Sequence, residues 1–291
     1  MSLPLHARAA ELGRALPPLL AQAQALVRAA MPGEHGRRRT GPGDEFWQYR
    51  AARAGDPARS IDWRRSARSD ALFVREHEWQ AAQSVTLWVD AGRSMEYAGD
   101  RRRPSKGERA RLLGLALAML LLRAGERVGL AGAQEPPRTG EAQGPRLARA
   151  LEDAAAASAR EHDLPDLSGL RPHGWAVMIS DFLAPEATLH EAVLQAADAG
   201  CRGALLQVLD PVEEAFPFAG RVVFETMTGS IRHETREAGA LRARYLSELA
   251  SRRERLAGLC RSIGWAFSTH HTGGPAQPAL LWLGQALGGG R

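Results

Sequence analysis

Two apolar segments that end on aspartate constrain the fold of this chain more than any other feature of its sequence. Residues 85–90 read VTLWVD, and residues 175–181 read WAVMISD. A short, continuous apolar run is typical of a strand that is covered on both faces. Further strands are predicted at 127–133, 203–210 and 265–272, and helices at 106–124, 146–160, 186–199, 237–263 and 276–287. This alternation predicts an α/β domain over residues 84–291, with a doubly wound, mostly parallel sheet.

The first 83 residues have a different texture. Residues 1–30 are rich in Ala and Leu at three- and four-residue steps, which predicts an amphipathic helical segment interrupted near Pro17 and Pro18. A loop rich in Gly, Pro and charges follows, and then short aromatic and β-branched pieces. We therefore expect a small β-rich module over residues 31–83.

Composition excludes several classes of protein. The formal net charge is +5, but residues 33–80 carry ten arginines and eight acidic residues, and this balance argues against a surface that follows phosphates. No apolar run approaches the length of a membrane span, and no secretory signal is visible. Cys201 and Cys260 are far apart and match no metal spacing. We expect a cytoplasmic protein with no membrane span and no nucleic-acid partner.

The strand-end aspartates are the first candidate site. In doubly wound sheets, ligands bind beyond the carboxyl ends of the strands, where Asp90 and Asp181 stand. Asp90, Ser94 and Asp181 offer the oxygen ligands that Mg²⁺ prefers, and Thr139 lies in a loop that offers one more hydroxyl. Gly92 stands where a second hydroxyl would be expected. The alternative is that Asp90 and Asp181 cap helices or tie down loops.

Two further charged segments are candidates for interaction. Residues 55–68 concentrate arginines and carboxylates around a tryptophan: Asp56, Arg59, Asp62, Trp63, Arg64 and Arg68. Directional Arg–carboxylate pairs of this kind pin a loop against its surroundings or recognise a partner. The basic helix at 237–263 is interpreted as a solvated face with pairs along the helix, and docking of an acidic partner is the alternative.

Common catalytic motifs are absent from the sequence. It contains no HExxH, no GxxxxGK[ST] and no GxSxG. His270 and His271 are neighbours on a predicted strand and so point to opposite faces. Lys106, the only lysine, is placed on a loop, which argues against a phosphoryl-transfer site.

A long, irregular motif is shared with a known family. It runs Gly41-x-Gly43-x-Glu45-Phe46, then Arg50, then Gly55-Asp56-x-x-Arg59-x-Ile61-Asp62-Trp63, then Ala67-Arg68. With the later pieces ISDFL, VFET, LRARY and THHT, it closely resembles the bacterial family DUF58, a domain of unknown function. The resemblance covers the chain from about residue 30 to its end.

The resemblance implies a von Willebrand factor type A-like fold for the second half. Such domains carry a metal-ion-dependent adhesion site with the pattern Asp-x-Ser-x-Ser, a loop Thr and a later Asp. Asp90, Ser94 and Asp181 match this pattern, Thr139 stands for the loop Thr, and Gly92 departs from it. Relatives are thought to act with MoxR-type AAA+ ATPases as adaptors.

Three hypotheses follow. The first is a non-enzymatic, cytosolic interaction module that acts with a MoxR-type ATPase, through Mg²⁺ held by Asp90, Ser94 and Asp181. The second is a metal-dependent phosphohydrolase that uses Asp90 as its nucleophile. The third is a purely structural module in which Gly92 marks a site that has lost its metal.

Overall fold

The chain divides into two compact units. The computed structural model describes residues 18–31, 46–52, 61–68, 71–77, 82–167 and 169–288. One unit is formed by residues 33–82, and the other by residues 1–32 and 83–291. The larger unit contains the α/β domain that the sequence predicts.

The larger unit is built on a five-stranded sheet in which every neighbouring pair is parallel. The strands are β3 (Ser84–Val89), β4 (Arg127–Leu130), β5 (Trp175–Ser180), β6 (Arg202–Leu209) and β9 (Ala266–His271). Their order is β4-β3-β5-β6-β9, so the chain runs from β3 outward to β4 and then returns to place β5 on the other side of β3. This confirms the predicted parallel, doubly wound sheet, and it puts the reversal of strand order between β3 and β5.

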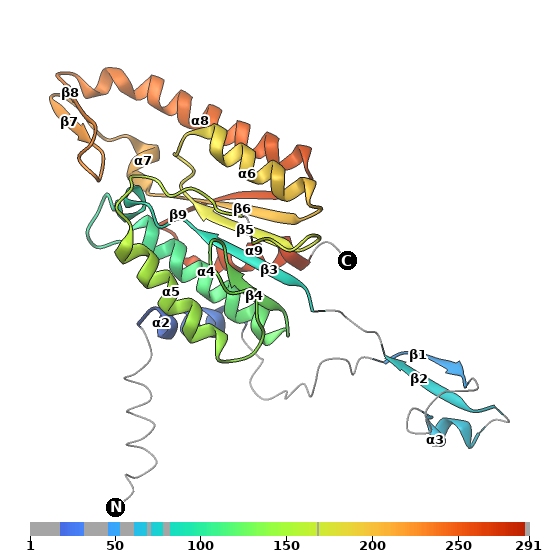
Figure 1. Cartoon of the computed structure of the whole chain (residues 1–291). Helices are drawn as coiled ribbons and strands as arrows, with labels where there is room; N and C mark the ends of the chain where they lie inside the picture. Colours follow the sequence, from blue (N-terminus) through green and yellow to red (C-terminus); the bar gives the residue numbers. More distant parts are fainter. Residues whose placement is uncertain are drawn as a thin grey trace, which may run out of the picture. The chain divides into compact units, whose positions relative to one another are not determined.

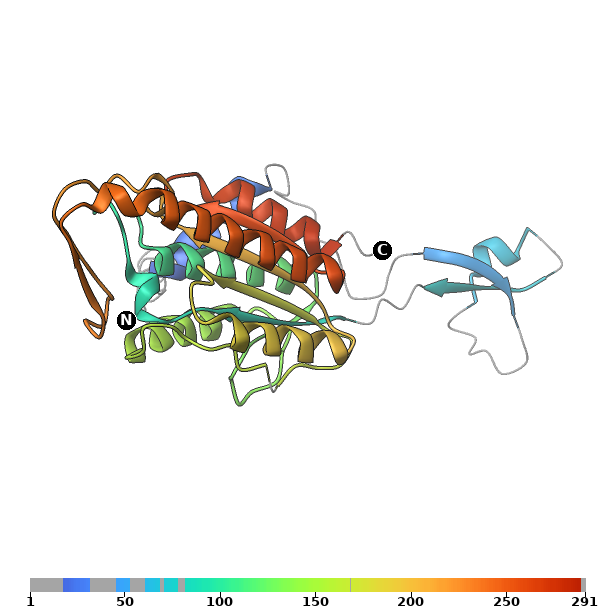
Figure 2. The same cartoon turned by 90° about the horizontal axis from the view of Figure 1, so that it is seen from above.

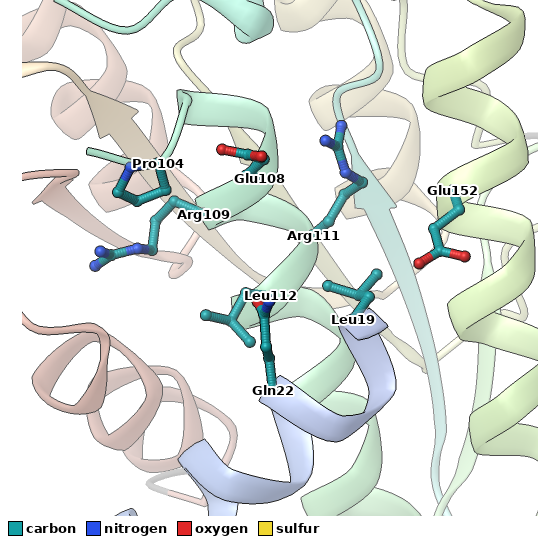
Figure 3. A pocket seen from close by; sticks show the side chains of 8 residues that line it. All are labelled: Leu19, Gln22, Pro104, Glu108, Arg109, Arg111, Leu112 and Glu152. Carbon is teal, nitrogen blue, oxygen red and sulfur yellow. The ribbon is translucent and has the colours of Figure 1, made fainter. Parts of the chain in front are cut away.

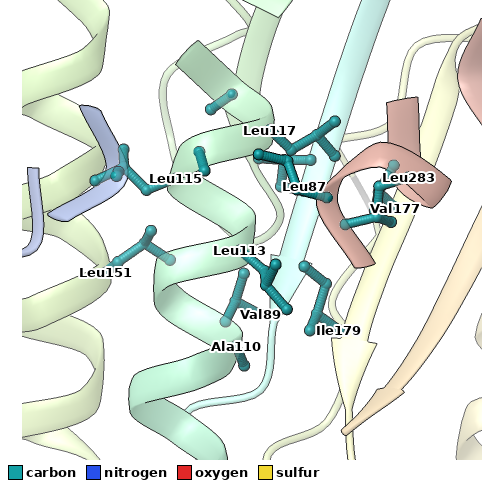
Figure 4. Packing of buried hydrophobic residues seen from close by; sticks show 14 of the residues in the cluster. Leu87, Val89, Ala110, Leu113, Leu115, Leu117, Leu151, Val177, Ile179 and Leu283 are labelled. Atoms are coloured by element: carbon teal, nitrogen blue, oxygen red, sulfur yellow. The ribbon is translucent and has the colours of Figure 1, made fainter. Parts of the chain in front are cut away.

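Helices cover both faces of the sheet (Figure 1). They are α4 (Lys106–Arg123), α5 (Gln143–Ala157), α6 (Glu186–Asp198), α8 (Ala238–Ser262) and α9 (Ala276–Gly288), with the short η2 (Arg93–Glu96) and α7 (Pro211–Ala215) at strand ends. One apolar core joins the sheet to α4, α5 and α9, and the other joins it to α6 and α8. Figure 4 shows Ala110 and Leu113 of α4 beside Val89 and Ile179 of the sheet. The near-continuous apolar strands are explained by this cover on both sides.

The N-terminal helix α2 (Pro18–Ala30) is part of the larger unit. Its apolar stripe of Leu19, Leu20, Ala23 and Val27 is buried in the same core as α4 and α9. Gln277 Nε2 of α9 donates a hydrogen bond to Ala29 O at 2.9 Å. The sequence predicts a separate helical segment over residues 1–30, whereas α2, the described part of that segment, belongs to the larger unit. The physical reason is that an amphipathic helix is stabilised mainly by burying its apolar stripe against a partner.

The smaller unit contains an antiparallel pair, β1 (Phe46–Ala51) and β2 (Phe73–His77), with the short helix α3 (Trp63–Ser66) between them in sequence. Asp62 caps α3, since its side chain accepts from Arg65 N at 3.1 Å. Ser66 is the buried residue of this turn, and its Oγ accepts from Phe73 N at 2.9 Å. The helix is thereby tied to β2.

A separate hairpin lies at the carboxyl-end edge of the large sheet (Figures 1 and 2). It consists of β7 (Val222–Glu225) and β8 (Arg232–Thr235), joined through the Thr228-Gly229-Ser230 turn. Phe224 of β7 packs in an aromatic group with Phe216 and Phe218, with ring centroids 5.8 and 5.3 Å away. The hairpin is anchored to the domain by this aromatic packing.

In the parts of the chain that the structure describes, no helix combines the length and apolarity that a membrane crossing requires.

Candidate site at the carboxyl ends of the strands

Asp90 and Asp181 follow two neighbouring strands, at the strand ends where the sequence places both of them. Val89 pairs with Ile179 in the register of β3 and β5, and each aspartate follows directly after its strand. Asp90 N donates to Ile179 O at 2.9 Å, which extends the ladder by one step. Both aspartates are buried, with exposed fractions of 1% and 0%. They stand at the reversal of strand order, which is the ordinary ligand position of such sheets.

Both carboxylate oxygens of Asp90 accept hydrogen bonds from neighbouring protein groups. Its Oδ1 accepts from Gly92 N at 2.8 Å, and its Oδ2 accepts from the Ser180 hydroxyl at 2.5 Å. Burial, and then the charge of Asp181, raise the pKa of Asp90 to about 7, although both hydrogen bonds oppose this. The carboxyl group is therefore held inside the protein by local hydrogen bonds.

Lys106 is the unexpected member of the site. It is the first residue of α4 and not a loop residue, because a capping box starts the helix directly before it: Glu108 N donates to Ser105 Oγ at 3.1 Å, and Ser105 N donates to Glu108 Oε2 at 2.8 Å. Its Nζ donates to Asp181 Oδ2 at 2.8 Å and to Glu213 Oε1 at 2.6 Å. The sequence predicts that Lys106 lies on a loop and outside any site. In the structure Lys106 begins α4 and contacts two carboxylates at the strand ends.

Lys106, Asp181 and Glu213 form a triad in which the ammonium and the two carboxylates stabilise one another's charges. Burial alone would lower the pKa of Lys106, but the charges of Asp181 and Glu213 outweigh burial and raise it above its ordinary value. Burial raises the pKa of Glu213, and Lys106 opposes that rise. The ring of Tyr97 also lies near the ammonium, with its centroid 5.7 Å from Nζ.

Glu213 was missed in the sequence reasoning, although a local signal marks it. Asp210, Pro211 and Glu213 form a capping box at the start of α7: Asp210 Oδ1 accepts from Val212 N at 2.9 Å, and Asp210 N donates to Glu213 Oε2 at 2.8 Å. The box orients Glu213 through its Oε2, and the other carboxylate oxygen, Oε1, accepts from Lys106 Nζ.

Gly92 is explained by a segment that arrives from far along the chain. Arg93 N and Ser94 N each donate at 2.8 Å to the carbonyl groups of Arg160 and Glu161. A Cβ at residue 92 would lie 2.7 Å from Asp163 N and 2.8 Å from Glu161 O. Residues 160–163, which we call the cap segment, therefore occupy the space that a serine at residue 92 would need.

The cap segment is held in turn by the hairpin. Both carboxylate oxygens of Glu161 accept hydrogen bonds from the β7–β8 turn: Met227 N at 3.1 Å, Thr228 N at 2.8 Å and Thr228 Oγ1 at 2.8 Å. Ser94 Oγ lies 3.2 Å from Nδ1 of His162. The loop after β3 is consequently covered by the cap segment, and the cap segment is fastened to the hairpin.

Thr139 does not join the site. Arg138 forms an antiparallel bridge with Val128, so the next residue, Thr139, lies alongside the amino end of β4 and is exposed. Asp90 and Asp181 are at the opposite, carboxyl-end edge of the sheet. The loop after β4 turns back along the strand before α5 begins, and this return separates Thr139 from the aspartates.

The arrangement does not fit a Mg²⁺ ion bound as the resemblance implies. A carboxylate oxygen that accepts one hydrogen bond can still bind an ion, but the Lys106 ammonium lies 2.8 Å from Asp181 Oδ2, and this positive charge disfavours a cation on the same carboxylate. Within the described ranges, no group of three or more His, Cys, Asp or Glu side chains is placed to hold a metal. Metal binding by Asp90, Ser94 and Asp181 stays a prediction, whereas Thr139 lies at the opposite edge of the sheet.

The second predicted network lies in the smaller unit. Asp56 and Arg59 are outside the described residues. Asp62 serves as the helix cap described above, whereas Trp63, Arg64 and Arg68 are exposed, with Trp63 at 60%. Partner binding by this cluster stays a prediction.

Helix α8 differs from the solvated face that its sequence predicts. Arg261 pairs along the helix with Glu254 at 2.7 Å, as expected. Arg252, however, donates to the carbonyl groups of Phe182 and Ala184, and Arg253 pairs with Glu214. These arginines fasten the loops after β5 and β6, so part of the basic helix supports the strand-end edge.

A cavity of about 380 Å³ lies elsewhere, among α2, the first half of α4 and α5. Figure 3 shows the side chains that line it, among them Arg109 of α4. The Arg109 guanidinium donates to Gly274 O at 2.7 Å and Thr272 O at 3.1 Å, which holds the loop between β9 and α9. Its charge therefore has a structural partner outside the cavity.

The fold and the strand-end residues define a doubly wound α/β protein with a buried, charged cluster at the reversal of strand order. The chain belongs to the family described as protein of unknown function DUF58, whose model matches residues 48–255. It is 28% identical over 244 residues to uncharacterized proteins of Mycobacterium tuberculosis and Mycobacterium bovis, across 80% of this chain and 76% of theirs.

Two solved structures are also similar. One is an aerotolerance-related membrane protein from Bacteroides fragilis, 16% identical with a TM-score of 0.43 over 72% of this chain and 100% of that one. The other is the conserved hypothetical protein BatB from Bacteroides thetaiotaomicron, 14% identical with a TM-score of 0.38 over 71% and 96%.

The pKa of Asp90 predicts a pH dependence of stability. Because the folded-state pKa of about 7 lies above the ordinary 3.8, the folded state binds more protons than the unfolded state, and stability falls as pH rises toward 7. Between pH 5.5 and 8 this group alone removes about 2 kcal/mol. Asp90→Asn should lose that part of the dependence in denaturant unfolding, whereas the exposed control Asp153→Asn should keep it. Equal pH dependence in all three proteins would contradict the assignment.

Proposed function

We propose that this chain is a non-enzymatic interaction module that acts with a MoxR-type AAA+ ATPase, on a von Willebrand factor type A-like domain. The partner comes from the family resemblance of the sequence. The observation that supports a binding role is the buried cluster at the strand ends, in which Asp90, Asp181 and Lys106 are all engaged with protein groups. A cluster held in this way shapes an edge of the domain and presents no free reactive group.

The outer surface of this edge offers a contact that needs no metal. The β7–β8 hairpin carries exposed apolar side chains at Val223, Met227 and Ile231, the last with 66% of its surface exposed. Leu164, just after the cap segment, is 42% exposed. Exposed apolar residues gathered on one element are typical of protein-binding surfaces. The proposed contact with the ATPase is made there, and not through a bridging ion.

One observation favours the phosphohydrolase alternative, and another argues against it. Lys106 lies in the site, which removes one argument against phosphoryl transfer. Asp90, however, is 1% exposed and both its oxygens accept hydrogen bonds, so a phosphorus atom has no access to it. Turnover of a generic phosphoester that disappears in Asp90→Asn would support this alternative.

The proposed function is tested by recovery of the tagged protein from its own cell extract, in Mg²⁺ and in EDTA. We expect a MoxR-type ATPase to be recovered with the wild type and with Asp90→Ala, and recovery to fall at least tenfold for Ile231→Ser with Met227→Ser. EDTA also removes the ATPase's own Mg²⁺, so loss in EDTA counts for a metal bridge only if Asp90→Ala reproduces it. Absence of the ATPase in every arm would contradict the proposal.

The matched control for the hairpin variant is Leu281→Ser on α9, another exposed apolar residue, 42% exposed, on a helix that packs on the sheet face covered by α4 and α5. It should recover as much ATPase as the wild type does. Equal losses in the two variants would indicate a general effect on folding or solubility.

A further inference from the structure

The Lys106 ammonium occupies a position that has the features of a cation site. Its nitrogen lies between two carboxylate oxygens, 2.8 Å from Asp181 Oδ2 and 2.6 Å from Glu213 Oε1. The exposed fractions of the three side chains are 2% for Lys106, 0% for Asp181 and 13% for Glu213. Two acidic groups therefore converge on one point inside the protein, and a positive charge stands at that point.

The distances are close to those of a bound divalent ion. Ca²⁺ binds carboxylate oxygens at about 2.3–2.6 Å, and Mg²⁺ at about 2.0–2.1 Å. The two oxygens are already directed at one centre, so a shift of a few tenths of an ångström brings them to the distance that Ca²⁺ requires. Asp181 and Glu213 supply the negative charge that acts on the ammonium, whereas buried Asp210, which shares the α7 capping box with Glu213, is paired with Arg103 at 3.3 Å.

We propose that Lys106 is a tethered cation: its ammonium takes the place of a divalent ion between Asp181 and Glu213, and the site binds a divalent ion only when residue 106 is small and neutral. Two buried carboxylates that face one another need a cation between them, because their repulsion is strong where water is excluded. A lysine supplies that charge from within the chain, with no dependence on the concentration of metal. This inference stands on the contacts of Lys106 and is independent of the proposed ATPase partner.

The experiment compares divalent-ion binding by the full chain and its variants after treatment with chelator. The probes are Mn²⁺, followed by electron paramagnetic resonance, and Ca²⁺ and Mg²⁺, followed by the shift in melting temperature. The wild type should show no stoichiometric Mn²⁺ binding, and millimolar Ca²⁺ should leave its melting temperature unchanged. Lys106→Ala should bind one Mn²⁺ per chain and melt several degrees higher in Ca²⁺, as mass action requires of a ligand that binds only the folded state.

Controls separate this site from other acidic surfaces. Lys106→Ala combined with Glu213→Gln should lose the bound Mn²⁺, whereas Lys106→Ala combined with Glu254→Gln, on the exposed part of α8, should keep it. Stoichiometric binding by the wild type that Asp181→Asn abolishes would overturn the proposal. So would a folded Lys106→Ala that binds no more Mn²⁺ than the wild type.

A variant that folds only with metal is also informative. If Lys106→Ala is unfolded in chelator and folds in Ca²⁺, the ion has replaced the ammonium, as proposed. Lys106→Ser is tested in the same way. Failure of both variants to fold, with and without each ion, would contradict the proposal, because an ion that can take the place of the ammonium should restore the fold.

Discussion

Lys106→Met is expected to destabilise the folded chain by about 3–5 kcal/mol at pH 7, the typical cost of removing one partner from a buried ion pair. The methionine keeps most of the volume of the lysine but leaves Asp181 and Glu213 without the cation that now lies between them. Denaturant unfolding followed by circular dichroism measures the loss, and the melting temperature should fall by about 2–4 °C per kcal/mol.

The pH dependence of this effect has a definite sign. The folded-state pKa of Lys106 lies above its ordinary 10.5, so its contribution is fully present below pH 10.5 and is lost only as pH rises through the folded-state value. The wild type therefore keeps this contribution throughout the neutral range. In Lys106→Met the uncompensated carboxylates take up protons at acid pH, so the deficit relative to the wild type should shrink as pH falls from 7 to 5.

The control is Arg261→Met, which removes the exposed pair with Glu254, whose side chains are 67% and 74% exposed. An exposed pair contributes little, and this variant should stay within about 0.5 kcal/mol of the wild type. Equal stabilities of Lys106→Met and the wild type would mean that the buried triad makes no net contribution to the fold.

Gly92→Ser is expected to cost about 3 kcal/mol, the upper part of the range for overpacking a buried position. The substitution restores the hydroxyl of the adhesion-site pattern, but its Cβ meets backbone atoms of residues 161–163 at 2.7–2.8 Å. Backbone atoms cannot turn aside as a flexible side chain does, so the cap segment must move and lose its bonds to Arg93 N and Ser94 N. Thermal unfolding measures the cost, and hydrogen exchange at those two amides should rise with it.

Gly284→Ser is the matched control for this variant. Gly284 is exposed on α9, and a Cβ built there meets no atom within 4 Å. Because glycine is a poor helix former, this change should be neutral or slightly stabilising. A Gly92→Ser protein as stable as the wild type, with protected amides at Arg93 and Ser94, would refute the account of Gly92.

Local patterns in the sequence were sufficient for the sheet and for one pair of site residues. The apolar runs before Asp90 and Asp181 predicted two buried parallel strands, and the structure places these strands side by side. The reason is that burial on both faces leaves a continuous apolar signature, and parallel strands end at the same edge.

For Lys106 and Glu213, the sequence contains signals for the helices that carry them but not for the contact between them. Ser105 and Glu108, and likewise Asp210 and Glu213, form capping boxes that are visible in the sequence. These signals locate two helix starts, and hence the elements that carry both side chains. They contain no information that the two helices meet, since Lys106 and Glu213 are 107 residues apart.

The sequence by itself therefore determined the class of the fold, the strand ends and the presence of two aspartates at one edge, because each of these follows from periodicity over a few neighbouring residues. Only the tertiary structure decided the chemistry of that edge. It brought Lys106 onto Asp181, closed the space at Gly92 with residues 160–163, and carried Thr139 to the opposite edge. The physical reason is that charge compensation and steric exclusion depend on which distant segments pack together, and that choice is made by burial over the whole domain rather than by any local pattern.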